Sequence, residues 1–221
     1  MTKKSFFVAA AVLLLIAGVI IGCMLLSGEK ETRKNISKID PDALPVNIRT
    51  ASYAYDISDK RVAVGAADYV FVGQVLRREG VAYEDPVPME LEDGSMVEVG
   101  NPYTHYTVQV LENMKGTLRT EKPIEIVKDG GAAQDGKAVY LFEKDCLPQT
   151  GKVYLFLAYT QEDGSLLISG MNSNIPIDVE KNSSKQVVKN ADIYQEYKTA
   201  IKNEIVPKGC QRDVSIYDKK E

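Results

Sequence analysis

The chain has 221 residues and a net charge of −4, with 27 lysine and arginine side chains against 31 aspartate and glutamate side chains. No stretch is rich in lysine or arginine, which excludes nucleic-acid binding because phosphate contacts need clustered positive charge. One histidine and three cysteines, one of them in an apolar leader, do not supply a zinc site. We therefore expect no nucleic acid, no metal and no cofactor.

The leader is the first feature along the chain. Lys3 and Lys4 precede an unbroken apolar run over residues 6–26. At about 1.5 Å of rise per residue, a helix of this length spans one bilayer core, and the lysines favour a cytoplasmic N-terminus. We expect residues 1–5 in the cytoplasm, 6–26 as a single-pass transmembrane anchor, and the bulk of the chain on the extracytoplasmic side of the cell membrane.

Two other interpretations of the leader remain open. The sequence Ile20-Ile21-Gly22-Cys23 has the form of a bacterial lipobox, and cleavage before Cys23 would leave that residue lipidated. An ordinary secretion signal needs a small-x-small cleavage site, and no good one follows Leu26. Residues 24–26 are apolar, which completes a spanning length but serves no purpose on a mature lipoprotein. This favours the retained helix.

A polar stretch over residues 27–57 contains Pro41 and Pro45 and indicates a stalk or linker. A short helix is then expected over residues 58–67, with Ser58 as its N-cap. Residues 69–76 are a dense run of β-branched and aromatic side chains, which is typical of a central strand buried on both faces.

An acidic hairpin follows. Residues 89–92 and 96–99 alternate apolar with acidic side chains, and Asp93-Gly94 supplies the positive φ angles of a tight turn. We expect this hairpin to have one solvated face. The next strand, over residues 103–111, places the only histidine, His105, on its more polar face as a surface or half-buried residue.

Four shorter strands and a C-terminal helix complete the pattern. The strands are expected at residues 124–127, 138–142, 153–159 and 166–169. The helix is expected to begin at Asn190 as its cap and to end before Pro207. Because there is no βαβ alternation, we predict a mainly β domain over residues 58–180, an antiparallel barrel or sandwich that is closed or nearly so, with residues 181–221 as a C-terminal helix and tail.

Four short sequence segments follow one another in a particular order and spacing within residues 58–170. They are Ala67–Val75, Tyr106–Gly116, Ile124–Val127 running into Gly130-Gly131, and Gly151–Leu157. The set resembles a group of bacterial extracytoplasmic proteins with a domain like tissue inhibitors of metalloproteinases and netrin modules. The resemblance implies an OB-type five-stranded barrel with extra strands and flanking helices. In the eukaryotic inhibitors a free N-terminal cysteine chelates the zinc of the protease, whereas Cys23 lies in the bilayer or is acylated, so that mechanism does not carry over.

Cysteine and aspartate side chains offer the remaining local candidates. Cys146 and Cys210 lie outside the leader, and an oxidising outer compartment permits a disulfide between them, with two unpaired buried thiols as the alternative. Asp129 and Asp135 flank a glycine-rich loop that could coordinate calcium, although the spacing matches no defined calcium loop and favours a solvated turn.

No nucleophile elbow, phosphate-binding glycine motif or dinucleotide fingerprint appears. We therefore expect a binding module rather than an enzyme, tethered through residues 6–26, with an envelope protein, a peptide or a glycan as its partner. Two alternatives remain. One is a protease-inhibitor-like module that acts through a loop near Gly130 or Pro148, and the other is a surface hydrolase whose carboxylates the sequence does not pair.

Overall fold

A computed structural model describes residues 40–91, 93–178 and 185–219. The chain divides into two units, Met1–Asp40 and Pro41–Glu221, and everything below concerns the second. The expected anchor over residues 6–26, with Cys23, lies outside the described residues. Within the part that is described, no helix is long and apolar enough to cross a bilayer.

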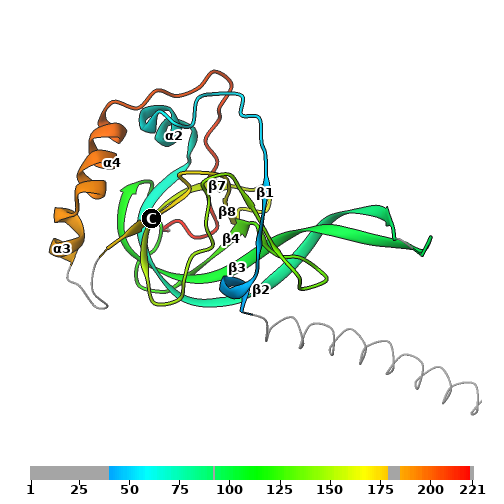
Figure 1. The fold of residues 1–221 in the computed structure, drawn as a ribbon. Coiled ribbons are helices and arrows are strands. Elements are labelled where there is room, and N and C mark those ends of the chain that lie inside the picture. The colour runs from blue at the N-terminus through cyan, green and yellow to red at the C-terminus, as the bar shows by residue number, and fades with distance from the viewer. Residues whose placement is uncertain (1–39, 92, 179–184, 220–221) are drawn as a thin grey trace, which may run out of the picture. The chain divides into compact units, whose positions relative to one another are not determined.

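Five strands close into a barrel (Figure 1). They are β2 (Tyr69–Glu90), β3 (Met96–Lys115), β4 (Ile124–Asp129), β7 (Val153–Thr160) and β8 (Leu166–Ile168). Their hydrogen-bonded order is β2-β3-β4-β8-β7, and a further pairing of β7 with β2 closes the ring. The prediction of a mainly β fold with a closed barrel is confirmed. One pair, β4 with β8, is parallel and departs from the expected antiparallel pattern.

The remaining strands lie outside this ring. β9 (Asn174–Ile177) pairs with β7. A separate three-stranded sheet contains β1 (Val46–Arg49), which is parallel to β6 (Val139–Phe142), and β5 (Gly131–Ala132), which is antiparallel to β6. A short 3-10 helix, η1 (Pro41–Ala43), precedes β1.

Residues 41–57 therefore belong to the folded unit, although the sequence analysis assigned them to the stalk. β1 has only four residues, of which three are exposed, so it carries no apolar pattern that would reveal a strand. Its partner β6 lies about 90 residues further along the chain, and the pairing Val46↔Val139 is not visible from local sequence.

In the described ranges three α-helices accompany the barrel: α2 (Lys60–Ala66), α3 (Lys185–Asn190) and α4 (Asp192–Lys202). The N-cap of α2 is Asp59 rather than Ser58, and its carboxylate accepts a hydrogen bond from the Arg61 amide at 2.9 Å.

The C-terminal helix also differs from expectation. Asn190 ends α3 instead of capping a helix, and α4 begins after Ala191 without a side-chain cap. α4 ends at Lys202, five residues before Pro207, because the chain leaves the helix at Asn203.

Alternate residues over Tyr69–Val75 of β2 and over β7 face two separate apolar cores, which confirms the predicted burial on both faces for these segments, although Leu76 is exposed. Inside the barrel, the rings of Phe71 and Phe156 pack with centroids 5.3 Å apart. On the outside, Val70 and Leu157 belong to a second core that includes α2 and α4 residues. Gly73 faces inward, where a Cβ would lie 2.5 Å from a Val108 methyl.

Candidate functional site

A groove of about 650 Å³ crosses the outer face of the barrel at β3 and β4. The two strands present its central residues, because in β4 Ile124 and Ile126 point into the barrel while Glu125 and Val127 point out. Glu84 of β2, the β7–β8 loop and two residues of the C-terminal tail also contribute. The lining consists of Glu84, Tyr103, His105, Glu125, Val127, Gln161, Glu162, Asp163, Ser165, Ile216 and Tyr217.

The β7–β8 loop forms one wall and is held by its own turn. Asp163 accepts a hydrogen bond from the Ser165 amide at 2.9 Å, and Gly164 adopts a φ of +80° that favours glycine. The C-terminal tail packs on this loop, since the Ser215 hydroxyl donates to the Gly164 carbonyl at 2.9 Å. A Cβ at Gly164 would lie 2.6 Å from an Ile216 methyl, so the loop and the tail fit together only with glycine there.

The groove is negatively charged. Its lining contains four carboxylates and no lysine or arginine, and no ion pair within the described ranges reaches any of the four. Hydrogen bonds from Ser165 lower the pKa of Asp163 and stabilise its charged form. His105 lies half-buried in this groove, in agreement with its expected position on the strand.

The β2–β3 ribbon extends beyond the barrel (Figure 1), and we call its outer part, residues 84–91 and 93–101, the arm. The predicted hairpin is confirmed, because the Leu91 amide donates to the Ser95 carbonyl at 2.8 Å and Gly94 has a φ of +79°. Pro86 and Pro88 lie on the β2 side.

The arm has one apolar face and one mostly acidic face. Directly opposed residues share a face, and the pair Met89↔Val97 lies on the apolar one, whereas Pro88↔Glu98 lies on the other. Met89 is 46% exposed and Val87 is 61% exposed. Both faces of the arm are therefore solvated, where the sequence predicted only one.

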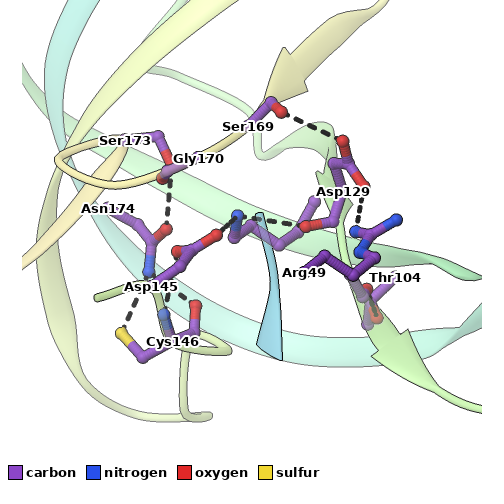
Figure 2. Close-up of polar contacts among 11 residues, drawn as sticks. Arg49, Thr104, Asp129, Asp145, Cys146, Ser169, Gly170, Ser173 and Asn174 are labelled. Atoms are coloured by element: carbon purple, nitrogen blue, oxygen red, sulfur yellow. Dashed lines mark hydrogen bonds and ion pairs between the residues drawn. The ribbon is translucent and has the colours of Figure 1, made fainter. Parts of the chain in front are cut away.

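A second polar group lies at one end of the barrel and is buried (Figure 2). The Lys128 side chain is 0% exposed, and its Nζ lies 2.5 Å from Oδ2 of Asp145, whose side chain is 2% exposed. Lys128 Nζ also donates to the Asp129 carbonyl at 3.2 Å, and Asp145 Oδ1 accepts from the Cys146 amide at 2.8 Å. Burial lowers the pKa of Lys128 and raises the pKa of Asp145.

Asp129 connects this buried pair to the end of β1 (Figure 2). Arg49, at the end of β1, contacts Asp129 Oδ1 at 2.6 Å, and the Ser169 hydroxyl donates to Oδ2 at 3.0 Å. The Arg49 guanidinium also lies over the Phe142 ring, 4.5 Å from its centroid. We call Arg49, Lys128, Asp129, Asp145 and Ser169 the buried cluster.

The two cysteines of the described unit are not joined. Both thiols are free, and they have different surroundings. Cys146 Sγ accepts a hydrogen bond from the Asn174 amide group at 3.2 Å, whereas Cys210 lies near Tyr55 and Tyr159. The disulfide that the sequence permits is not formed in this structure.

Asp129 and Asp135, the two aspartates considered for calcium, have different partners in the structure. Asp129 is paired with Arg49, while Asp135 is exposed and accepts from the Lys137 amide at 3.0 Å. Over the ranges that the structure describes, no group of three or more histidine, cysteine, aspartate and glutamate side chains is placed to hold a metal ion.

Sequence reasoning missed the buried cluster, although one signal was present. Ile124, Ile126 and Lys128 occupy the same face of β4, and the first two are core residues, so the alternation places a lysine inside the barrel. Its partner Asp145 comes from a loop, and no local pattern links the two.

Together the observations define a closed five-strand barrel with an acidic groove on its outer face, a projecting arm and a buried ionic end. No protein-family model matches the chain, and a search of curated proteins finds no match.

Proposed function

We propose that this protein is a non-catalytic, extracytoplasmic binding module with an OB-like barrel of the inhibitor and netrin type, held at the cell membrane through residues 6–26. The strand order supports the OB-like assignment. Counted along the chain, the barrel strands one to five are β2, β3, β4, β7 and β8, and strand three pairs in parallel with strand five.

The position of the groove carries the proposal. OB-type barrels bind their ligands on the face of strands two and three, between the first connection and the fourth. Here β3, β4 and the β7–β8 loop line the groove, and Glu84 adds a carboxylate from β2, the strand that leads into the first connection.

The charge of the groove selects the ligand. Four carboxylates in a lining without lysine or arginine repel phosphate and attract cations, and the ring of Tyr103 offers a face on which a guanidinium or ammonium group can stack. The Tyr217 ring already holds such a contact, because the Arg119 guanidinium lies 5.0 Å from its centroid. We therefore assign a lysine- and arginine-containing peptide segment of an envelope protein as the ligand. The apolar face of the arm provides an adjoining contact for apolar side chains of the same partner.

The test is a titration of fluorescent peptides with the full chain in detergent micelles. Basic peptides should bind, and acidic peptides of equal length should not. Glu125→Gln and Asp163→Asn keep the shape of the groove and remove one charge each, so each should weaken binding about two- to fivefold. Met89→Ser should weaken binding of peptides that also carry apolar residues.

Glu143→Gln is the matched control, because Glu143 is exposed and does not line the groove. Unchanged affinity in both groove variants would contradict the proposal. Binding of neutral oligosaccharides in place of basic peptides would support the glycan alternative instead.

The enzyme alternative is the runner-up, because the groove gathers His105 with several carboxylates. No hydrogen bond within the described ranges joins His105 to Glu84, Glu125, Glu162 or Asp163, so binding is better supported than hydrolysis. Release of product from a glycan or ester substrate by the purified chain, lost in His105→Gln, would favour the hydrolase.

The inhibitor alternative now concerns a different loop. Gly130 and Pro148 are buried, and the projecting element is the arm. A protease-inhibition assay with the full chain and with Met89→Ser separates this alternative from simple binding.

A further inference from the structure

The buried cluster contains an amine and a carboxyl group held in contact and shielded from solvent. Lys128 Nζ and Asp145 Oδ2 lie 2.5 Å apart, and the two side chains are 0% and 2% exposed. A buried ion pair is an expensive arrangement, because desolvation of two charges commonly outweighs their attraction. The same two groups can lose both charges by forming an amide.

We propose that Lys128 and Asp145 form an intramolecular isopeptide bond that covalently ties β4 to the loop between β6 and β7. The geometry supports this inference. Asp145 is fixed by the Cys146 amide on Oδ1, which leaves Oδ2 and the carboxyl carbon facing the lysine. Lys128 in turn is fixed within the barrel, where it pairs in register with Thr104 of β3 and Ile168 of β8.

The chemistry needs no additional reactant. A proton passes from the ammonium group to the carboxylate across their hydrogen bond, which leaves a neutral amine and a neutral carboxylic acid. The amine lone pair attacks the carboxyl carbon, the new bond joins Nζ to Cγ, and the carboxyl hydroxyl leaves with one amine proton as water. Two charges and one water molecule are removed, and one amide remains.

The environment favours both steps. Burial lowers the pKa of Lys128 and raises the pKa of Asp145, and both of these shifts populate the neutral pair that the reaction requires. The neighbouring charge of Asp129 raises the pKa of both groups, which favours the protonated acid and opposes loss of the lysine proton. Two reacting groups held in contact behave as if at a very high local concentration, which offsets the unfavourable condensation of amines and acids in water.

Arg49 and Ser169 act as positioning residues. They hold the Asp129 carboxylate at 2.6 Å and 3.0 Å and so keep that charge beside the reacting pair. The bond would close a loop of 17 residues and restrict the unfolded chain, in the way that a disulfide does.

Peptide mapping of the full chain, purified in detergent, tests the proposal. Trypsin cannot cut after a lysine whose amine is in an amide, and it does not cut the Lys122–Pro123 bond. The expected product is therefore residues 120–137 joined to residues 145–152, lighter than the two separate peptides by one water molecule. Lys128→Arg and Asp145→Ala should each abolish the joined product.

Lys115→Arg is the matched control, since Lys115 is also nearly buried, at 7% exposure, and is paired with Glu204 at 2.9 Å. This variant should keep the joined peptide. The unsubstituted chain alone decides the question if a variant fails to fold. Recovery of an unmodified peptide ending at Lys128 together with an unmodified 145–152 peptide would overturn the proposal. Loss of water confined to one unjoined peptide, as in a succinimide at Asp145, would overturn it as well.

Discussion

The buried cluster and the groove are both rich in carboxylates, but they differ in where the opposite charge comes from. In the buried cluster, Asp129 and Asp145 each face a cation of the same chain, at 2.6 Å and 2.5 Å. In the groove, Glu125 and its three acidic neighbours face no lysine or arginine of the lining. The first arrangement holds the fold together, and the second leaves the cation to be supplied by a partner.

The largest expected effect is the loss of Asp145. Asp145→Ala abolishes the proposed cross-link and leaves the Lys128 amine buried without a partner, so it should destabilise the fold by at least about 3–5 kcal/mol. Glu125→Ala in the groove should change stability by less than about 0.5 kcal/mol. Urea unfolding of the two variants measures the contrast, and equal losses would show that the groove is structural too.

Loss of Arg49 should have the next largest effect. Arg49→Ala removes the cation from Asp129, whose side chain is 12% exposed, and should cost about 1–3 kcal/mol because a buried acceptor loses its partner. Arg212→Ala is the control, since Arg212 pairs with Glu204 at 2.7 Å but is 50% exposed, and it should cost less than about 1 kcal/mol. The same unfolding assay compares the two arginines.

Alkaline pH should lower the free energy of unfolding by a smaller amount, through tyrosines that are buried in the folded state. Burial raises the pKa of Tyr69 and Tyr197 from 10.0 to about 12. Their stabilising contribution is complete below pH 10, where both states hold the proton. It falls as the pH rises from about 10 to about 12, because only the unfolded state ionises there. Tyr197→Phe should flatten the pH dependence of unfolding in this range, and an unchanged slope would assign it to other groups.

Salt should have the smallest effect on the fold and a clear one on the groove. Raising the ionic strength from about 0.1 M to 1 M shortens the screening length from about 10 Å to about 3 Å and should weaken peptide binding. The stability difference between the unsubstituted chain and Asp145→Ala should hardly change, because the buried contact between Lys128 and Asp145 is shielded from ions whether it is an ion pair or the proposed amide. Peptide binding that resists salt would argue for an apolar rather than a charged contact.

Much of the barrel was predictable from sequence because its strands carry strong local patterns. The runs over residues 69–76 and 153–159 are mostly apolar on both faces, and the structure buries both faces between two cores, in the first run as far as Val75. Asp93-Gly94 predicted the hairpin for the same reason, since its turn chemistry is local. Helix ends were less predictable, because Asp59 competed with Ser58 for the same cap.

The sites were not predictable, because they depend on pairings between distant segments. The groove needs β3 and β4 beside the β7–β8 loop, which only the closure of the ring brings about. Lys128 and Asp145 meet because a loop folds over the end of the barrel, and Arg49 reaches them through a parallel pairing between β1 and β6. Such contacts depend on topology rather than on sequence period.

The two prolines of the arm limit how molecules can associate. Pro86 and Pro88 have no amide hydrogen, so the β2 edge of the arm is a poor template for recruiting another chain. Growth of an extended intermolecular sheet requires two competent edges on every copy, and the arm offers one. Strand addition to the arm therefore stops after a single partner, which keeps neighbouring copies from polymerising while leaving a one-to-one complex accessible.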